Sequence, residues 1–380
     1  MSKVLRICLC GLLVAVIGCG PKVSGAAPVI SSVGSASRAY LDDNRLNWER
    51  TARRPLNTTI WYPTEASVDK RQGHSQDANP LFIPLPPTAQ SAPLSNSRPR
   101  YPLILISHGT GGSASGMFWL GYHLAARGYI VAAVNHHGNT GAEPRMDSRG
   151  FLLYWERARD ISAVLDKLLD DPVFGSRINR QQIGAAGFSL GGYTVMALAG
   201  GRFNHSEYDR FCDSSARDFT CGPQPEFPDA PGLFQDLKAH DTLVRDSLAH
   251  SGDSYRDPRI RAIFAIAPVF GRAFTRADVS DIRIPVEIVV GRGDTVAPPA
   301  TNAQHYAALI SGAKLMLLPA TVTHYTFVPA CTDQGKQTLT RLCYDVPGLN
   351  RQRVQAQVGD LAAAFFQKSL SINLHGNHQP

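Results

Sequence analysis

A serine with a glycine two residues away on each side lies in the middle of the sequence, in Gly187-Phe188-Ser189-Leu190-Gly191. The motif follows a short apolar run, 183–188, and precedes a run with helical character, 190–199, which predicts a sharp turn between a strand and a helix. Such a turn projects the Ser189 hydroxyl above the edge of a sheet, and the two glycines remove Cβ atoms that would collide. The pattern therefore predicts a nucleophilic serine at a helix N-terminus, which favours developing negative charge.

A serine hydroxyl is a weak nucleophile until a base takes its proton, and the base needs an acid to orient it. Asp294 follows the apolar run 284–290, and His324 follows the run 314–318. Catalytic groups collect at the carboxyl ends of the strands of an open α/β sheet. The chain order of serine, acid and histidine therefore predicts a catalytic triad of Ser189, Asp294 and His324.

Other residues compete for these roles. Asp294 could be a turn residue after Gly293, and Asp281 is a rival acid, although it precedes its strand and would lie at the opposite edge of the sheet. Among the 12 histidines, His305 falls in a helical stretch before the last strand, and His375 and His378 fall in a polar tail. Only His324 follows the last predicted strand at the required place.

A tetrahedral oxyanion needs two backbone N–H donors, one of which should come from the turn after an earlier strand. Ser107-His108-Gly109-Thr110-Gly111-Gly112 follows the apolar run 102–107, and its glycines let backbone amides approach a substrate. We predict the N–H groups of Thr110 and Leu190 as the two donors. The alternative, a phosphate-binding loop, would need a Gly-Lys-Ser/Thr ending that this turn lacks.

Continuous apolar runs alternate with helical or loop-length segments along most of the chain. Such runs indicate strands buried on both faces, and therefore a parallel sheet covered by helices. Apolar residues at helical spacing predict amphipathic helices over 161–169 and near 354–365. The alternation predicts a mostly parallel, doubly wound α/β sheet. The expected strands are 56–62, 102–107, 129–134, 183–188, 260–266, 284–290 and 314–318.

Two intervals break this rhythm. Residues 64–100 are rich in Pro, Ser, Gln and Asn and are expected to form a surface excursion. Residues 201–258 are too long for a connector and contain a possible helix at 233–250. The second interval is either a cap over an active site or a decorative insertion.

The N-terminus has the features of an export signal. Lys3 and Arg6 precede an apolar run of 12 residues, 7–18, which is shorter than the about 20 residues that span a bilayer. The run ends in Val16-Ile17-Gly18-Cys19, which resembles the lipobox of bacterial lipoproteins, so we expect lipidation at Cys19 and a place on the periplasmic side of a membrane or at the cell surface. Ordinary cleavage near residues 23–26, giving a secreted protein, is the alternative.

This division predicts a signal peptide at 1–18, a flexible tether at 19–36, one domain at 37–370 with a cap-like insertion at about 201–258, and a disordered tail at 371–380. Hydrophobic residues make up 43% of the chain and charged residues 18%, which excludes wholesale disorder. The net charge of +7 comes from scattered Lys and Arg, so nucleic acid is not an expected partner.

Four of the seven cysteines lie in the predicted domain, and an even number in an exported chain indicates disulfides. Three pairings are possible, and the short-range one is the simplest. A bridge seven residues past His324 would steady the histidine loop. The spacing does not fit zinc, and adjacent His136 and His137 point apart on extended chain, so no metal site is expected and the two histidines are assigned to a rim loop. The candidate disulfide residues are Cys212, Cys221, Cys331 and Cys343.

With these residues placed, the chain resembles the α/β-hydrolase superfamily, and more narrowly the predicted dienelactone hydrolases grouped with type II platelet-activating factor acetylhydrolases. The resemblance covers roughly residues 40–370. It implies a Ser-Asp-His triad, no cofactor, and hydrolysis of small-molecule esters with small acyl groups. It departs from authentic dienelactone hydrolases, whose nucleophile is cysteine. The motifs that carry it are Trp61-Tyr62-Pro63, Ser107-His108-Gly109, Asn135-His136 with Gly138-Asn139-Thr140, Gly187 to Gly192, and Gly293-Asp294.

Three functions follow as hypotheses from these motifs. The first is an exported serine esterase that is anchored in a membrane by lipid. The second is a lipase or phospholipase A acting on membrane lipid, with residues 201–258 as its lid. The third, from another class, is a binding protein built on a catalytically dead hydrolase fold, against which the complete triad argues.

Overall fold

The computed structural model describes residues 32–67, 81–83 and 86–371. The predicted signal peptide, Cys19 and the tail from residue 372 onward lie outside the described residues.

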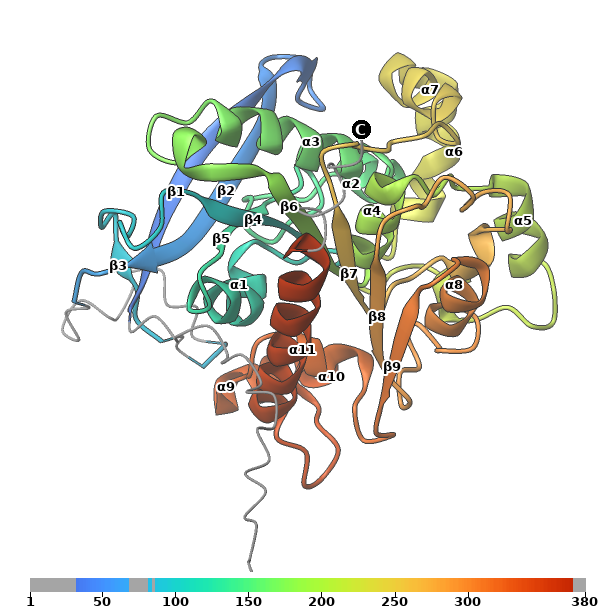
Figure 1. The fold of residues 1–380 in the computed structure, drawn as a ribbon. Helices are drawn as coiled ribbons and strands as arrows, with labels where there is room; N and C mark the ends of the chain where they lie inside the picture. Colours follow the sequence, from blue (N-terminus) through green and yellow to red (C-terminus); the bar gives the residue numbers. More distant parts are fainter. Residues whose placement is uncertain (1–31, 68–80, 84–85, 372–380) are drawn as a thin grey trace, which may run out of the picture.

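The described residues form a nine-stranded mixed sheet with the strand order β3-β1-β2-β5-β4-β6-β7-β8-β9 (Figure 1). Neighbouring strands from β5 to β9 in this order are parallel, whereas β2 is antiparallel to both β1 and β5. The strands are β1 Ser32–Leu46, β2 Arg53–Thr64, β3 Ala89–Gln90, β4 Tyr101–Ser107, β5 Ile130–Val134, β6 Ile178–Phe188, β7 Ala262–Ile266, β8 Val286–Gly291 and β9 Lys314–Leu318.

Helices cover both faces of this sheet. Helices α1 and α11 pack against each other on one face, and α3 and α4 pack together on the other (Figure 1). The helices are α1 Phe118–Ala125, α2 Ser148–Leu152, α3 Glu156–Leu169, α4 Leu190–Ala199, α5 His205–Cys212, α6 Ala230–His240, α7 Thr242–Ala249, α8 Ala303–Leu309, α9 Asp333–Thr338, α10 Thr340–Cys343 and α11 Arg351–Ser371, with short 3-10 turns that include Phe219–Cys221 and His324–Phe327.

The central strands carry the core. Every residue of β5 and β7 is buried, as continuous apolar runs between two helical layers require. The prediction of a mostly parallel sheet wound on both faces is confirmed. Because β5 and β6 lie on opposite sides of β4, loops leave the sheet in opposite directions beside β4, which is where ligands bind in open α/β sheets.

The predicted tether is wrong at its C-terminal end, because residues 32–36 belong to β1. These mostly small residues show no alternating pattern, but they pair with residues 60–64 at the C-terminal end of β2. At Gly34 a Cβ would lie 2.4 Å from a ring carbon of Tyr62, so the aromatic side chain requires glycine there. The strand predicted at 56–62 is also longer than expected and runs through Pro63 to Thr64.

The helix expected at 233–250 is two helices, α6 and α7. Asp241 separates them because its backbone is extended, with φ −97° and ψ 112°, and its side chain accepts hydrogen bonds from the N–H groups of Leu243 and Val244. Aspartate is a favoured N-cap residue, and here the cap outweighs a continuous helical pattern.

Candidate active site

The turn between β6 and α4 has the strained geometry that its glycines predict. Ser189 has φ +55° and ψ −116°, and its N–H donates to the carbonyl of Ile266 at 2.9 Å. A Cβ at Gly187 would lie 2.0 Å from the carbonyl oxygen of Gly191, and a Cβ at Gly191 would lie 2.0 Å from that of Ser107. Both glycines are therefore required by backbone contact, and the turn fixes where the Ser189 hydroxyl lies.

The structure brings the three predicted triad residues into one hydrogen-bonded chain. His324 Nε2 lies 2.9 Å from Ser189 Oγ, and His324 Nδ1 lies 2.7 Å from Asp294 Oδ2. The exposed fractions of the serine, aspartate and histidine are 7%, 3% and 3%. With the Nδ1 proton directed at a carboxylate, Nε2 is free to accept the serine proton.

Asp294 is held in place by its own loop. Its second oxygen, Oδ1, accepts hydrogen bonds from the N–H groups of Val296 at 2.9 Å and Ala297 at 2.7 Å. The rival acid Asp281 forms an ion pair with Arg202 on the surface, 2.5 Å apart. The alternative histidine, His305, binds the carbonyl of Phe274.

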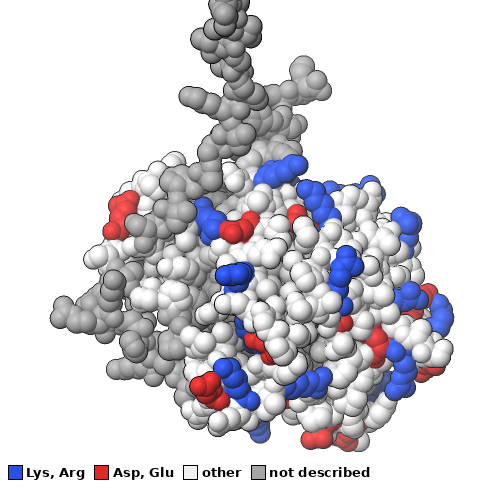
Figure 2. Space-filling model, turned by 90° about the horizontal axis from the view of Figure 1, so that it is seen from below, with Lys and Arg blue, Asp and Glu red and all other residues white. Residues whose placement is uncertain are grey.

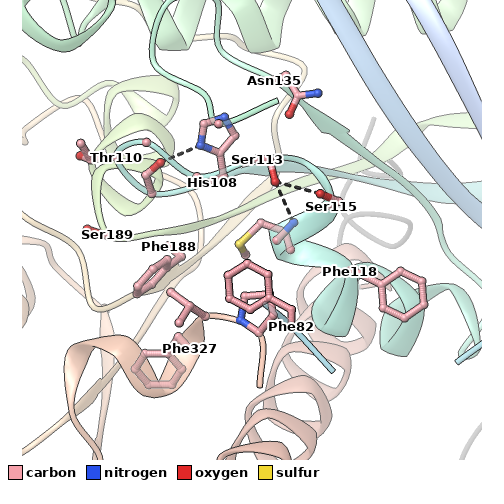
Figure 3. A pocket seen from close by; sticks show the side chains of 18 of the residues that line it. Phe82, His108, Thr110, Ser113, Ser115, Phe118, Asn135, Phe188, Ser189 and Phe327 are labelled. Carbon is pink, nitrogen blue, oxygen red and sulfur yellow. Dashed lines mark hydrogen bonds between the residues drawn. The ribbon is translucent and has the colours of Figure 1, made fainter. Parts of the chain in front are cut away.

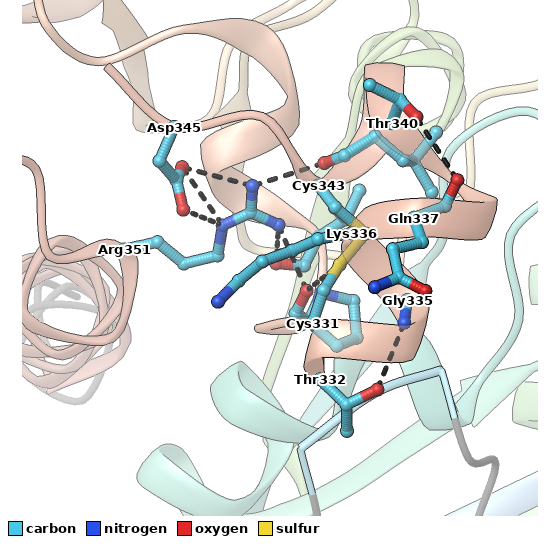
Figure 4. Close-up of a disulfide and its surroundings, with 12 residues drawn as sticks. Cys331, Thr332, Gly335, Lys336, Gln337, Thr340, Cys343, Asp345 and Arg351 are labelled. Atoms are coloured by element: carbon cyan, nitrogen blue, oxygen red, sulfur yellow. Dashed lines mark hydrogen bonds and ion pairs between the residues drawn. A yellow bond between two sulfur atoms is a disulfide. The ribbon is translucent and has the colours of Figure 1, made fainter. Parts of the chain in front are cut away.

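Side chains of α11 and a disulfide hold the loop that carries His324 in place (Figure 4). Gln355 Nε2 donates to the carbonyls of Thr326 at 3.0 Å and Val328 at 2.7 Å, and Arg351 donates to the carbonyls of Val328 and Pro329. A disulfide joins Cys331 to Cys343, and a second joins Cys212 to Cys221. Both bridges follow the short-range pairing.

The loop after β4 lies beside the nucleophile. Its conformation is fixed by Asn139 Oδ1, which accepts from the N–H of Gly111 at 2.7 Å, and by Thr140, whose hydroxyl donates to the carbonyl of Gly112 at 2.8 Å. The N–H groups of Thr110 and Leu190 donate to no other group within the described part of the chain. Two unused donors beside Ser189 are what an oxyanion site requires.

Ser189 and His324 open into a cavity of about 980 Å³. The rings of Phe82, Phe188 and Phe327 lie together below the loop that carries Thr110 and Ser113 (Figure 3). The cavity therefore has an apolar side formed by rings and a polar side formed by backbone and hydroxyl groups, as small-molecule sites commonly do.

The interval 201–258 contributes one wall of this cavity, at residues 219–226. Asp218 accepts hydrogen bonds from Thr301 and from Asn302, the latter at 3.0 Å, in the segment that follows Asp294. Phe219 stacks under the guanidinium of Arg341 at 4.7 Å, and the same guanidinium lies 5.8 Å from the ring of Tyr325, next to His324. The wall is thus attached to both loops that carry triad residues.

Glu226 is the acidic residue of that wall. Its side chain lies against Gly111, where a Cβ would be 3.0 Å from the Cβ of Glu226. Burial raises the pKa of the Glu226 carboxyl above its ordinary value, although its own N–H, His324 and Arg341 act in the opposite direction. The Glu226 side chain therefore lies against the predicted oxyanion loop, and burial favours the neutral form of its carboxyl.

The assignment of His136 to a rim loop is wrong, because its side chain is completely buried. It binds Ser107 Oγ at 2.9 Å and Asp160 Oδ2 at 3.0 Å, and burial lowers its pKa to about 3. Sequence reasoning missed this polar network beneath the site. The available signal was charge on the buried face of α3, where Arg157 and Asp160 precede Ile161, Val164, Leu165 and Leu168 at helical spacing.

Within residues 32–67, 81–83 and 86–371, no group of three or more His, Cys, Asp or Glu side chains could hold a metal ion. The helices of that same part of the chain are too short or too polar to cross a membrane. Figure 2 shows one face on which basic and acidic side chains are interspersed and form no field of a single sign.

Comparisons with known proteins agree with this geometry. A model described as the alpha/beta hydrolase family matches residues 103–330, which include all three triad residues. Two cutinases of Thermobifida alba, est2 and est1, are each 34% identical to the chain over 104 residues, which are 27% of this chain and 31% of the relative. The chain thus matches about a third of the length of these curated relatives.

A solved structure of a ferulic acid esterase from Streptomyces cinnamoneus superposes with a TM-score of 0.58. The superposition covers 92% of this chain and 93% of the esterase, at 20% sequence identity. At this identity the likeness shows the fold alone.

Proposed function

Because the chain belongs to the alpha/beta hydrolase family, we propose that it is an exported serine hydrolase that cleaves carboxylic esters. The observation that carries this proposal is the buried hydrogen-bonded chain from Ser189 through His324 to Asp294. The similarity to two cutinases supports ester substrates over other substrates of this family.

In the proposed reaction, Ser189 Oγ attacks the ester carbonyl while His324 Nε2 takes the hydroxyl proton. Asp294 holds the imidazole in the required tautomer and stabilises the imidazolium that forms. The N–H groups of Thr110 and Leu190 bind the oxyanion of the tetrahedral intermediate. His324 then protonates the leaving alcohol, and water, activated by the same histidine, hydrolyses the acyl-enzyme. These steps use side chains and backbone amides of this chain alone.

The substrates we propose are esters with small acyl groups and a larger alcohol part. The cavity of about 980 Å³ is larger than a short acyl chain requires, and the remaining volume suits the alcohol. A lipase or phospholipase A is the second candidate, because the aromatic rings of the same cavity would also contact a long acyl chain. A chain-length series of p-nitrophenyl esters separates the two: a preference for about eight carbons or more favours the lipase.

We also propose that Cys19 carries a lipid that anchors the protein on the outer side of a membrane. The apolar run 7–18 with its lipobox-like ending supports this placement, and two disulfides fit an oxidising compartment. Replacement of Cys19 with Ser should release the protein from the membrane fraction. Unchanged attachment of the Cys19→Ser variant would exclude the lipid anchor.

The direct test of the activity is a panel of carboxylic esters run against wild type and Ser189→Ala. We expect hydrolysis of short-chain esters by wild type and a loss of at least about 10³-fold in Ser189→Ala, whose fold should be unchanged. A folded wild-type chain that hydrolyses no ester and does not react with a fluorophosphonate would instead support a binding protein on a hydrolase fold.

A further inference from the structure

Arg157 is a buried arginine of α3 that lies directly beneath the proposed oxyanion site. Its side chain is 1% exposed, and it forms no ion pair with any carboxylate of the described residues. The nearby carboxylate of Asp160 is already bound by Arg45, Arg54 and His136. An arginine buried without a partner carboxylate is costly, and burial lowers the pKa of Arg157 to about 9.

The hydrogen bonds of Arg157 reach the two elements that carry the proposed oxyanion donors. On one side, Nη2 donates to the carbonyl of His108, two residues before Thr110. On the other side, Nε donates to the hydroxyl of Thr194 at 3.3 Å, and that hydroxyl donates to the carbonyl of Leu190 at 3.0 Å. One rigid guanidinium therefore connects the loop after β4 with the first turn of α4.

The two connected elements have little freedom to separate or approach. A Cβ at Gly191 would lie 2.0 Å from the carbonyl oxygen of Ser107 and 2.8 Å from that of His108, so the two backbones are already in contact. Contact limits their approach, whereas the fork of Arg157 limits their separation. A displacement of about 1 Å between two donors that must reach one oxygen atom is enough to cost catalysis.

We propose that Arg157 is a positioning residue that sets the distance between the Thr110 and Leu190 N–H groups in the oxyanion hole. The proposal rests on the ester hydrolase function proposed above. Arg157 does not touch the substrate, and it acts through the His108 carbonyl and the Thr194 hydroxyl. A guanidinium suits this role because its donors diverge in a fixed plane, which the single ammonium of lysine does not reproduce.

The test compares Arg157→Met and Arg157→Lys with Arg159→Met, an exposed arginine on the same helix that serves as the control. For a p-nitrophenyl ester we expect Arg157→Met to lower kcat by about 10–100-fold while KM changes less than about threefold, because an oxyanion donor acts in the transition state. Arg157→Lys should recover part of this loss. Arg159→Met should leave both constants unchanged.

A second pair of variants keeps the test decisive if Arg157→Met does not fold. Thr194→Val removes the hydroxyl that links Arg157 to Leu190 at nearly constant volume, and Thr194→Ser retains it. We expect Thr194→Val to lower kcat by about tenfold and Thr194→Ser to remain close to wild type. The rate of Ser189 phosphonylation by a fluorophosphonate should fall in parallel, since the phosphonyl oxygen occupies the same site.

Three outcomes would overturn the positioning role. The first is an unchanged kcat in a folded Arg157→Met variant. The second, which applies if Arg157→Met does not fold, is an unchanged kcat in Thr194→Val. The third is a rise in KM with no change in kcat in the variant that folds. Each of them leaves the proposed function standing if wild type hydrolyses esters and Ser189→Ala does not. Failure of the proposed function itself appears as an absence of turnover in wild type.

Discussion

Removal of the Cys331–Cys343 disulfide should weaken the domain by an amount that follows from the loop it closes. The bridge joins residues 12 positions apart, for which loop-closure entropy gives about 3 kcal/mol. A domain of this size has an unfolding entropy of roughly 0.7 kcal/mol per kelvin, so the thermal midpoint should fall by about 4 °C. We therefore expect the Cys331→Ser, Cys343→Ser double variant to unfold about 4 °C below wild type.

The effect of this variant on activity should be smaller than its effect on stability. Gln355 and Arg351 still hold the carbonyls of the segment 326–329 after the bridge is removed, so His324 keeps most of its anchors. We expect kcat at 25 °C to fall less than about tenfold. Gln355→Leu, which keeps the disulfide but removes two hydrogen bonds next to His324, should lower kcat at least as much.

Differential scanning fluorimetry and initial rates with a p-nitrophenyl ester measure both effects. The matched control is Cys212→Ser with Cys221→Ser, which opens a loop of 9 positions and should lower stability by about 2.5 kcal/mol without a loss of kcat beyond about twofold. If removing the Cys331–Cys343 bridge leaves both the thermal midpoint and the activity unchanged, then the bridge does not steady the histidine loop and the reasoning is refuted.

Three further predictions concern single residues. Asp294→Asn should lower kcat by about 10⁴-fold with little change in KM, because the imidazole loses its required tautomer, and steady-state kinetics measure the split. Gly187→Ala should destabilise the domain by about 3 kcal/mol or more, since its Cβ meets the Gly191 carbonyl, whereas Gly232→Ala, with open space around it, should stabilise α6 by about 0.5–1 kcal/mol in denaturant titrations. Burial raises the pKa of Asp171, but hydrogen bonds from Arg38, Tyr40 and two backbone N–H groups lower it by a larger amount. The pKa of Asp171 is therefore below its ordinary value. Asp171→Asn should therefore cost about 1–2 kcal/mol above pH 5, and the difference from wild type should vanish as the pH falls below about 4 through the folded pKa; a difference independent of pH would contradict this assignment.

The sheet and the triad could be predicted from sequence because each depends on short-range patterns. The strands β4 to β9 each contain a continuous apolar run, and in this topology all of their carboxyl ends meet at one edge. A residue directly after such a run is therefore placed by the run itself. Asp294 and His324 follow β8 and β9 in this way, which is why the structure brings them to Ser189.

The parts that sequence did not predict depend on contacts between distant segments. The start of β1 consists of small residues that are held by pairing with β2 and β3. The polar network around Arg157 and His136 joins α3 to loops after β4 and β5, and no local pattern encodes such contacts. Likewise, the attachment of Asp218 to Thr301 and Asn302 arises between segments more than 80 positions apart.

Covalent labelling tests directly whether Ser189 is the nucleophile. The full chain is treated with a fluorophosphonate and digested, and the adduct is located by mass spectrometry alongside the residual hydrolysis of a short-chain ester. We expect one phosphonyl group per chain, on Ser189, with activity lost in proportion to labelling, and neither label nor activity in Ser189→Ala. Ester hydrolysis that persists in Ser189→Ala, or an inactivating adduct on another residue, would contradict this expectation.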